Sequence, residues 1–101
     1  MAQSRHAQEP WQRACQRGRV FVLVWSRAGA SHLSEMRRKL AYAQQLQKPI
    51  RILRTDGPPI PEDLCLGHQD LQTAHTLTPE DAARQIERWL DEITQREEEG
   101  V

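Results

Sequence analysis

The run Val20–Trp25 constrains the fold of this chain more than any other feature. It holds six consecutive apolar residues, three of them valine, and no charge. β-Branched residues favour strands, and a strand that is apolar on both faces is typical of a parallel sheet covered by helices. We therefore expect a buried parallel strand here. This is the longest apolar run of the chain, and a membrane-spanning helix needs about 20 such residues, so we expect no contact with a membrane.

A short helix is expected just before this strand. Pro10 suits the first helical position. Apolar residues then follow at i, i+3 and i+4 from Trp11, which predicts one buried stripe. Gly18 is expected to end the helix in a left-handed conformation. Residues 1–8 carry no such pattern, and we expect them to form a disordered start.

A second helix is expected over residues 32–47, after a loop at residues 26–31. Either Ser31 or Ser34 suits its N-cap, and Pro49 marks its end. Its apolar residues recur at spacings of three and four, as a helix with one buried face requires. This stripe consists of Leu33, Met36, Leu40 and Ala43.

The remaining patterns predict two more strands and a last helix. Strands are expected at residues 50–53 and 71–76. Thr78 and Pro79 then supply a cap and a first helical residue, with acidic residues in the first turn, where the helix dipole favours them. We expect residues 96–101 to fray. The apolar face of this helix consists of Ala82, Ala83, Ile86, Trp89, Leu90 and Ile93.

Strands that alternate with helices predict an α/β fold with parallel pairing. The expected architecture is a small three-layer sandwich, with a short parallel sheet of about three strands flanked by helices. It forms a single domain over residues 9–95. Three strands are few for such a sheet, so we interpret the chain as part of a doubly wound domain or as one completed by a second copy.

The charges are divided between the two halves of the chain. Residues 1–54 carry a net charge of +9 and residues 55–101 a net charge of −9, which cancel to zero. This division favours ion pairing inside the domain or between copies. Nucleic acid is a less favoured partner, because no aromatic residues are interleaved with the basic ones. The basic cluster consists of Arg37, Arg38, Lys39, Arg51 and Arg54.

The cysteines and histidines indicate a compartment but no metal. Cys15 and Cys65 are too few for a disulfide framework, and no secretory signal opens the sequence, so we expect a reduced cytoplasmic setting. His68 and His75 could approach Asp70, but no histidines stand at metal-ligand spacing. We therefore predict no metal site.

The turn at residues 26–32 is the candidate ligand site. Ligands of open α/β sheets bind beyond the carboxyl ends of strands, and a helix N-terminus offers free N–H groups to a phosphate. An ordinary strand-to-helix loop is the alternative interpretation. Glu35, in the first turn of the second helix, is the candidate acid; the alternative is that it only complements the helix dipole. The candidate cofactor-binding residues are Ser26, Arg27, Gly29, Ser31 and His32.

Several segments resemble bacterial TIR-like domains. The resemblance covers about residues 11–95 and corresponds to the later part of that fold, without its first strand. Nucleoside deoxyribosyltransferase-like and other Rossmann-like nucleotide-binding domains share part of the pattern. The segments that carry it are Val20–Ser26, Leu40–Ala43, Leu46–Ile50, Ile52–Leu53, Ile60–Leu64, Leu71 and Pro79–Ala83.

The resemblance implies a flavodoxin-like fold, self-association and, in many members, cleavage of NAD at its glycosidic bond. The catalytic glutamate of the family falls on Lys39 here, and a lysine cannot stabilise a positively charged transition state. Our first hypothesis is therefore a cytoplasmic signalling or defence protein that acts by forming homo-oligomers or by binding a protein partner, without catalysis. The alternative is an NAD glycohydrolase or nucleotide sensor that uses the turn at residues 26–32 and Glu35.

Overall fold

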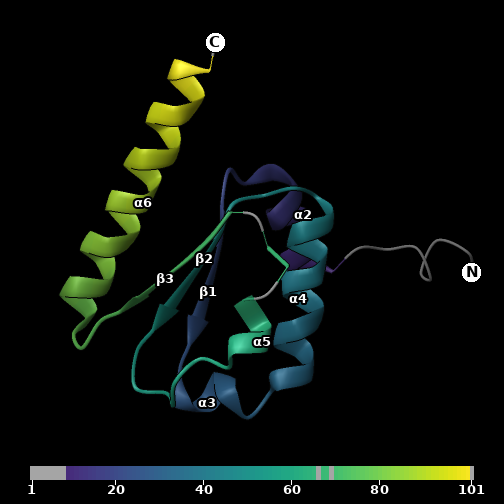
Figure 1. Cartoon of the computed structure of the whole chain (residues 1–101), viewed down its shortest axis with the longest axis vertical. Coiled ribbons are helices and arrows are strands. Elements are labelled where there is room, and N and C mark those ends of the chain that lie inside the picture. The colour runs from purple at the N-terminus through teal and green to yellow at the C-terminus, as the bar shows by residue number, and fades with distance from the viewer. Residues whose placement is uncertain (1–8, 66, 69, 101) are drawn as a thin grey trace, which may run out of the picture.

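The computed structural model describes residues 9–65, 67–68 and 70–100, and Figure 1 shows them as a three-layer α/β sandwich. The expected disordered start at residues 1–8 lies outside the described residues. The elements are α2 (Pro10–Arg17), β1 (Phe21–Trp25), α3 (Arg27–Ala30), α4 (Leu33–Gln45), β2 (Ile50–Arg54), α5 (Glu62–Cys65), β3 (Leu71–His75) and α6 (Pro79–Glu99). No helix of the described residues is long and apolar enough to span a membrane.

The sheet has three strands in the order β1-β2-β3, and both pairs are parallel, as predicted. Phe21 pairs with Ile50, and Ile50 pairs with Leu71, so the three strands begin at the same level. The third strand, expected at residues 71–76, is confirmed at Leu71–His75. Because β2 is central, β1 and β3 cover both of its edges, and four of its five residues are buried.

The main apolar core lies between one face of the sheet and helices α2, α4 and α5. Strand residues that alternate toward this face meet the apolar stripe of α4, where Leu40 and Ala43 are buried and Leu33 and Met36 pack at the margin. The predicted stripe of this helix is therefore confirmed. The buried members of this core are Cys15, Leu23, Trp25, Leu40, Ala43, Ile50, Ile52 and Leu64.

Helix α6 covers the opposite face of the sheet (Figure 1). Side chains alternate along a strand, so Arg51 and Leu53 point away from the main core. Both are buried, and Trp89 and Ile93 are the buried residues of α6. The helix extends to Glu99, so residues 96–99, which we expected to fray, are helical. Among the described elements, one helix covers this face, whereas three cover the other.

The helix ends follow the sequence in part. Glu9 and Gln12 form a capping box at α2, and the Thr78 hydroxyl accepts a hydrogen bond from the backbone of Asp81 at 3.1 Å, as its cap position predicts. Gly18, however, is extended (φ −76°, ψ 160°), so the left-handed ending predicted for α2 is wrong. The chain passes directly from this residue toward β1, and an extended conformation serves that course.

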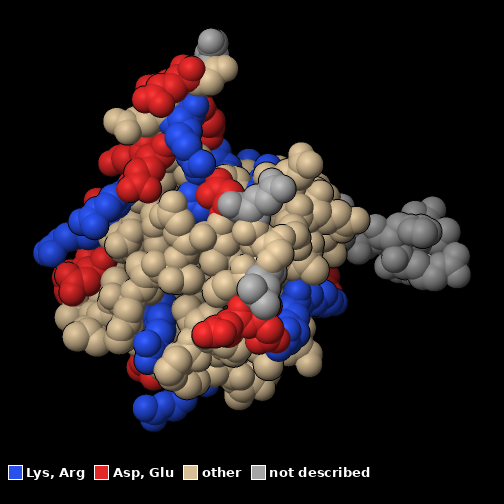
Figure 2. All heavy atoms as spheres, viewed as in Figure 1, with Lys and Arg blue, Asp and Glu red and all other residues tan. Residues whose placement is uncertain are grey.

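Some of the basic residues of the first half form ion pairs with acidic residues of the second half inside the domain. Ion pairs that join the halves link Arg19 to Glu97, Arg37 to Asp63 and Arg51 to Asp70. Most acidic side chains of α6 face solvent instead, and Figure 2 shows them along this helix, interspersed with basic ones. The last helix therefore neutralises the basic half at a few points rather than along its length.

Candidate functional site

The predicted turn contains a short helix rather than a simple loop. Ser26 follows β1 and caps α3, and its Oγ accepts a hydrogen bond from the backbone N–H of Gly29 at 3.1 Å. His32, not Ser31 or Ser34, occupies the N-cap position of α4, without a side-chain cap. Ser31 instead donates from its hydroxyl to the carbonyl oxygen of Ala28 at 2.6 Å. The hydroxyl groups of Ser26 and Ser31, which were expected to bind a ligand, thus form hydrogen bonds within the turn.

A carboxylate of the chain itself occupies the start of α3. The backbone N–H of Arg27 donates to Oδ1 of Asp56 at 3.1 Å. This hydrogen bond is the main reason why the pKa of Asp56 lies below its ordinary value. A phosphate would need the same kind of N–H donor at a helix start. Asp56 therefore competes with any anionic ligand at the position that the sequence favoured.

The loop after β2 also covers the end of β1. The N–H of Thr55 donates to the carbonyl oxygen of Trp25 at 3.0 Å, and the Trp25 indole donates to the carbonyl oxygen of Pro58 at 2.8 Å. Between them, a Cβ on Gly57 would stand 2.9 Å from the Ser26 carbonyl carbon. The crevice that open α/β sheets use for ligands is closed here by backbone.

The remaining predicted residues line a small hollow of about 180 Å³. Gly29, His32 and Glu35 lie on it, as does Lys39. A Cβ on Gly29 would stand 2.5 Å from the terminal methyl of Met36, so this glycine accommodates a core side chain rather than a ligand. Small-molecule sites span about 300–1,000 Å³, and the hollow is too small for a dinucleotide.

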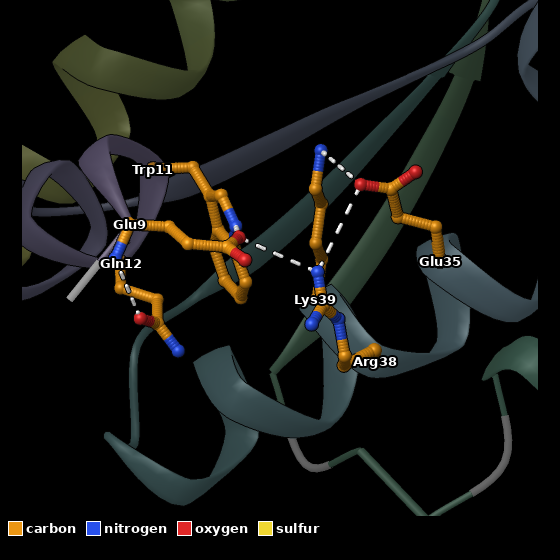
Figure 3. A network of polar contacts seen from close by, with 6 residues as sticks. All are labelled: Glu9, Trp11, Gln12, Glu35, Arg38 and Lys39. Atoms are coloured by element: carbon orange, nitrogen blue, oxygen red, sulfur yellow. Dashed lines mark hydrogen bonds and ion pairs between the residues drawn. The ribbon is translucent and has the colours of Figure 1, made fainter. Parts of the chain in front are cut away.

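Glu35 belongs to an exposed network of charges on α4, shown in Figure 3. Its Oε1 lies 3.9 Å from Lys39 Nζ and 3.9 Å from Arg38 Nη2. Arg38 also pairs with Glu9 at 3.4 Å, and Glu9 accepts a hydrogen bond from the Trp11 indole. Both cations lie over the Trp11 ring, 5.5 Å and 5.7 Å from its centroid. The network ties α2 to α4 at the surface.

Glu35 therefore has neighbours that disfavour the catalytic role considered for it. Lys39, to which the TIR-like resemblance would assign the acid, lies one helical turn after Glu35 and pairs with it. Glu35 lines the small hollow, and about half of its side chain is exposed to solvent. The structure brings Gly29, His32 and Glu35 to one hollow, and directs Ser26 and Ser31 to backbone partners.

Sequence reasoning missed a buried charge network at the other end of the sheet. Arg51 is fully buried, and its Nη1 donates to Asp70 Oδ1 at 3.0 Å. The other oxygen of Asp70 accepts from Arg96 of α6, also at 3.0 Å. Burial alone would raise the pKa of Asp70, but the hydrogen bonds from both arginines outweigh it and lower the pKa. The sequence offers one signal for this network. In Ile50-Arg51-Ile52 the arginine alternates with isoleucines, which places its side chain on the opposite face of the sheet from theirs.

Arg54, the last residue of β2, lines a second hollow. Sequence reasoning did not predict this position. Its Nε donates to the carbonyl oxygen of Gly57 at 3.2 Å. The hollow, which has a volume of about 590 Å³, lies beyond the ends of β2 and β3. Among the described residues, no three His, Cys, Asp or Glu side chains come together as a metal would require.

No protein-family model matches the chain, no curated protein matches it, and no solved structure matches it. The resemblance to TIR-like domains therefore stays a prediction. What the structure itself establishes is an α/β domain with one parallel three-stranded sheet. A functional conclusion has to rest on the surfaces of this domain.

Proposed function

We propose that this protein is an association module, which pairs with a second copy of itself through the outer edge of β1. The observation that carries the proposal is an apolar strip of residues from β1 and α6. Val24 of β1 is 48% exposed and Leu90 of α6 is 41% exposed, although neither carries a polar group. We call Val22, Val24, Ile86 and Leu90 the β1 strip. The proposal does not require the TIR-like resemblance, which remains a prediction.

The position of α6 brings these four residues to one side. Arg19, just before β1, donates from Nη1 to the Thr94 hydroxyl at 3.2 Å and pairs with Glu97 at 3.9 Å. These contacts place that side of α6 toward the start of β1. Leu90 is four residues before Thr94 and so lies on the same side of the helix. Leu90 therefore borders the face of β1 that carries Val22 and Val24.

The backbone of β1 offers the hydrogen-bonding groups that pairing needs. Phe21 donates to Pro49, and Trp25 accepts from Thr55, so the odd residues of β1 bond to β2. The N–H and C=O groups of Val22 and Val24 consequently point away from β2. Edge strands are normally protected by charges, proline or bulges. Residues 20–25 carry none of these charges or prolines.

A second copy satisfies this edge in an antiparallel arrangement about a two-fold axis. With Val22 opposite its own counterpart, Val20 and Val24 face each other across the axis. β-Branched pairs of this kind stabilise neighbouring strands by about 0.2–1 kcal/mol each. The resulting sheet has six strands, and the two α6 helices lie on the same face with Leu90 between them. This arrangement buries the β1 strip of both copies.

The test is sedimentation velocity over a wide concentration series, with Val24→Glu as the variant. We expect the unaltered protein to sediment as a dimer at high concentration and V24E as a monomer, because the new carboxylate would be buried in the paired strands. Leu77→Glu is the matched control. Leu77 is 83% exposed and follows β3, at the far edge of the sheet, so L77E should leave the dimer intact.

Circular dichroism of each variant shows whether the fold is kept. A protein that stays monomeric at every concentration would contradict the proposal, as would a V24E variant that dimerises like the unaltered chain. The cytoplasmic setting is part of the same proposal and is supported by the two free cysteines, Cys15 and Cys65.

A further inference from the structure

A hollow of about 590 Å³ lies beyond the carboxyl ends of β2 and β3, on the face of the sheet that carries α5. Its volume falls within the range of small-molecule sites, about 300–1,000 Å³. The carboxyl ends of parallel strands are also where open α/β sheets hold their ligands. At the end of β1 this position is closed by residues 55–58, so the open part of the crevice is shifted toward β3. The hollow lies on a different surface from the β1 strip.

The hollow is open because little covers β3. α5 has only four residues, and no described strand pairs with the outer edge of β3. Thr73 and His75 alternate with Ala74 along this strand, and both are exposed on the side of the hollow. Figure 2 shows that the surface over β3, between α6 and α5, carries few charged side chains. A ligand here would meet hydroxyl and imidazole groups rather than ion pairs.

Arg54 supplies the cation of the hollow. Its half-buried side chain is held by the hydrogen bond from Nε to the carbonyl oxygen of Gly57, at 3.2 Å. Among the described residues, no carboxylate lies within ion-pair distance of this guanidinium. Its two terminal nitrogens are therefore available. An arginine fork binds a carboxylate or a phosphate through two parallel hydrogen bonds.

The neighbours of Arg54 complete a mixed polar and apolar lining. His75 is its partner in the β2–β3 register, and the Nε2 of His75 lies 3.1 Å from the carbonyl oxygen of Thr55. Because a carbonyl oxygen only accepts, Nε2 is the donor of this contact, and Nδ1 of the neutral ring can then only accept a hydrogen bond from a donor group of a ligand. Ile60 and Cys65 form an apolar wall. Burial, with a smaller contribution from a nearby carboxylate, raises the pKa of Cys65, so its thiol stays protonated and uncharged.

We propose that this hollow binds a small organic anion, with its carboxylate or phosphate on Arg54 and an apolar body against Ile60 and Cys65. Glu62 also lines the hollow and would repel a second negative charge. The site therefore favours molecules with one anionic group over polyphosphates. Carboxylate and phosphate share the chemistry that Arg54 recognises, and the experiment separates them.

The test is a ¹H–¹⁵N NMR titration of the full chain with benzoate and with phenyl phosphate. Acetate and inorganic phosphate serve as probes that lack the apolar body. We expect saturable shifts at Arg54, Thr73 and His75 with at least one aryl probe, and weaker binding of the matching small anion. The aryl probe that binds more tightly identifies the head group.

Arg54→Gln should weaken binding of that probe by about tenfold or more, since the charge-assisted pair is lost. Arg88→Gln, on the exposed side of α6, is the matched control and should bind as the unaltered protein does. Both variants should retain dispersed spectra and the same sedimentation behaviour. The absence of saturable shifts with both aryl probes would overturn the proposal. Equal affinity for acetate and benzoate, or unchanged binding in R54Q, would overturn it as well.

Discussion

Arg51 and Asp70 form an ion pair in which the guanidinium is fully buried and the carboxylate is about one-third exposed, with 3.0 Å between Nη1 and Oδ1. Arg96 holds the second carboxylate oxygen from outside. The pair joins the centre of the sheet to the segment before β3 and, through Arg96, to α6. It also leaves Nε and Nη2 of Arg51 without a partner among the described residues.

We predict that Asp70→Ala lowers the free energy of unfolding by about 3 kcal/mol or more. The variant leaves the buried charge of Arg51 uncompensated. Asp63→Ala is the control, because Asp63 pairs with Arg37 at the exposed surface, and such pairs contribute at most about 1 kcal/mol. Urea unfolding monitored by tryptophan fluorescence measures both variants. Equal losses in the two would contradict the prediction.

Arg51→Met gives a second control on the same interpretation. This variant removes the buried charge, and the Asp70 carboxylate that remains is about one-third exposed and keeps Arg96 as its partner, so no uncompensated charge stays buried. Two nitrogens of Arg51 also lack partners among the described residues. We expect R51M to unfold within about 1 kcal/mol of the unaltered protein. A loss as large as that of D70A would mean that the pair itself, rather than the unpaired charge, determines the stability.

The stability should depend on acid through Asp70. Although burial alone would raise the pKa of this carboxyl, hydrogen bonds from Arg96 and Arg51 lower it. The unfolded chain then binds a proton more readily than the folded one. Above the ordinary carboxyl pKa of about 3.9, Asp70 makes its full contribution to the free energy of unfolding. As the pH falls from there through the folded-state pKa of Asp70, this contribution is lost.

Urea unfolding at several values between about pH 6 and pH 2.5 measures this effect. The free energy of unfolding should fall with acid more steeply in the unaltered protein than in Asp70→Asn, which has no proton to bind at this position. Asp91→Asn, on the exposed surface of α6, should keep the original slope. Identical slopes in the unaltered protein and D70N would show that this carboxyl does not govern the acid response.

Local signals in the sequence were enough to predict most of the fold. The apolar run at residues 20–25 and the Thr78–Pro79 cap each depend on neighbouring residues, and the parallel strand and the helix start that they predict are confirmed. The expected burial of that strand on both faces is wrong, because β1 is an edge strand and Val24 is 48% exposed. The short helices α3 and α5 were not predicted. A four-residue helix has little intrinsic stability, and α3 depends on Asp56, which is 29 residues away from the N–H that it accepts from.

The candidate site was predicted less well for the same reason. The pattern around Ser26 is that of a helix start, and the sequence gives no indication that the loop after β2 folds over it. The hydrogen bond between Trp25 and Pro58 spans 33 residues. Arg54 had been placed in a basic cluster with residues of α4. The register that sets it beside His75 depends on strand pairing, which single residues do not reveal.

The closure over β1 should depend on Gly57. A Cβ at this position would stand 2.9 Å and 3.0 Å from backbone atoms of Ser26, which cannot move aside. We predict that Gly57→Ala lowers the free energy of unfolding by about 1–3 kcal/mol, as overpacking does. Gly29→Ala is the matched control. Its Cβ would clash with the flexible end of Met36 alone, and the Val24 carbonyl oxygen and the Ser26 Oγ lie at ordinary contact distances of 3.4 Å and 3.5 Å, so thermal unfolding should show a smaller loss. Equal losses would contradict the account of the closed crevice.

The end of α4 offers a stabilising substitution. Gln47 follows the helix with φ 61°, and Lys48 and Gln47 donate to the carbonyl oxygens of Ala43 and Gln44 at 3.1 Å and 2.9 Å. This is a Schellman motif, in which glycine is preferred at the left-handed position. A side chain there costs about 1 kcal/mol, so Gln47→Gly should raise the free energy of unfolding by about that amount. Ala41→Gly, at an exposed position inside the helix, should lower it by about 0.5–1 kcal/mol. If both variants are destabilised in urea unfolding, the Gln47 side chain contributes contacts that outweigh the strain of its backbone.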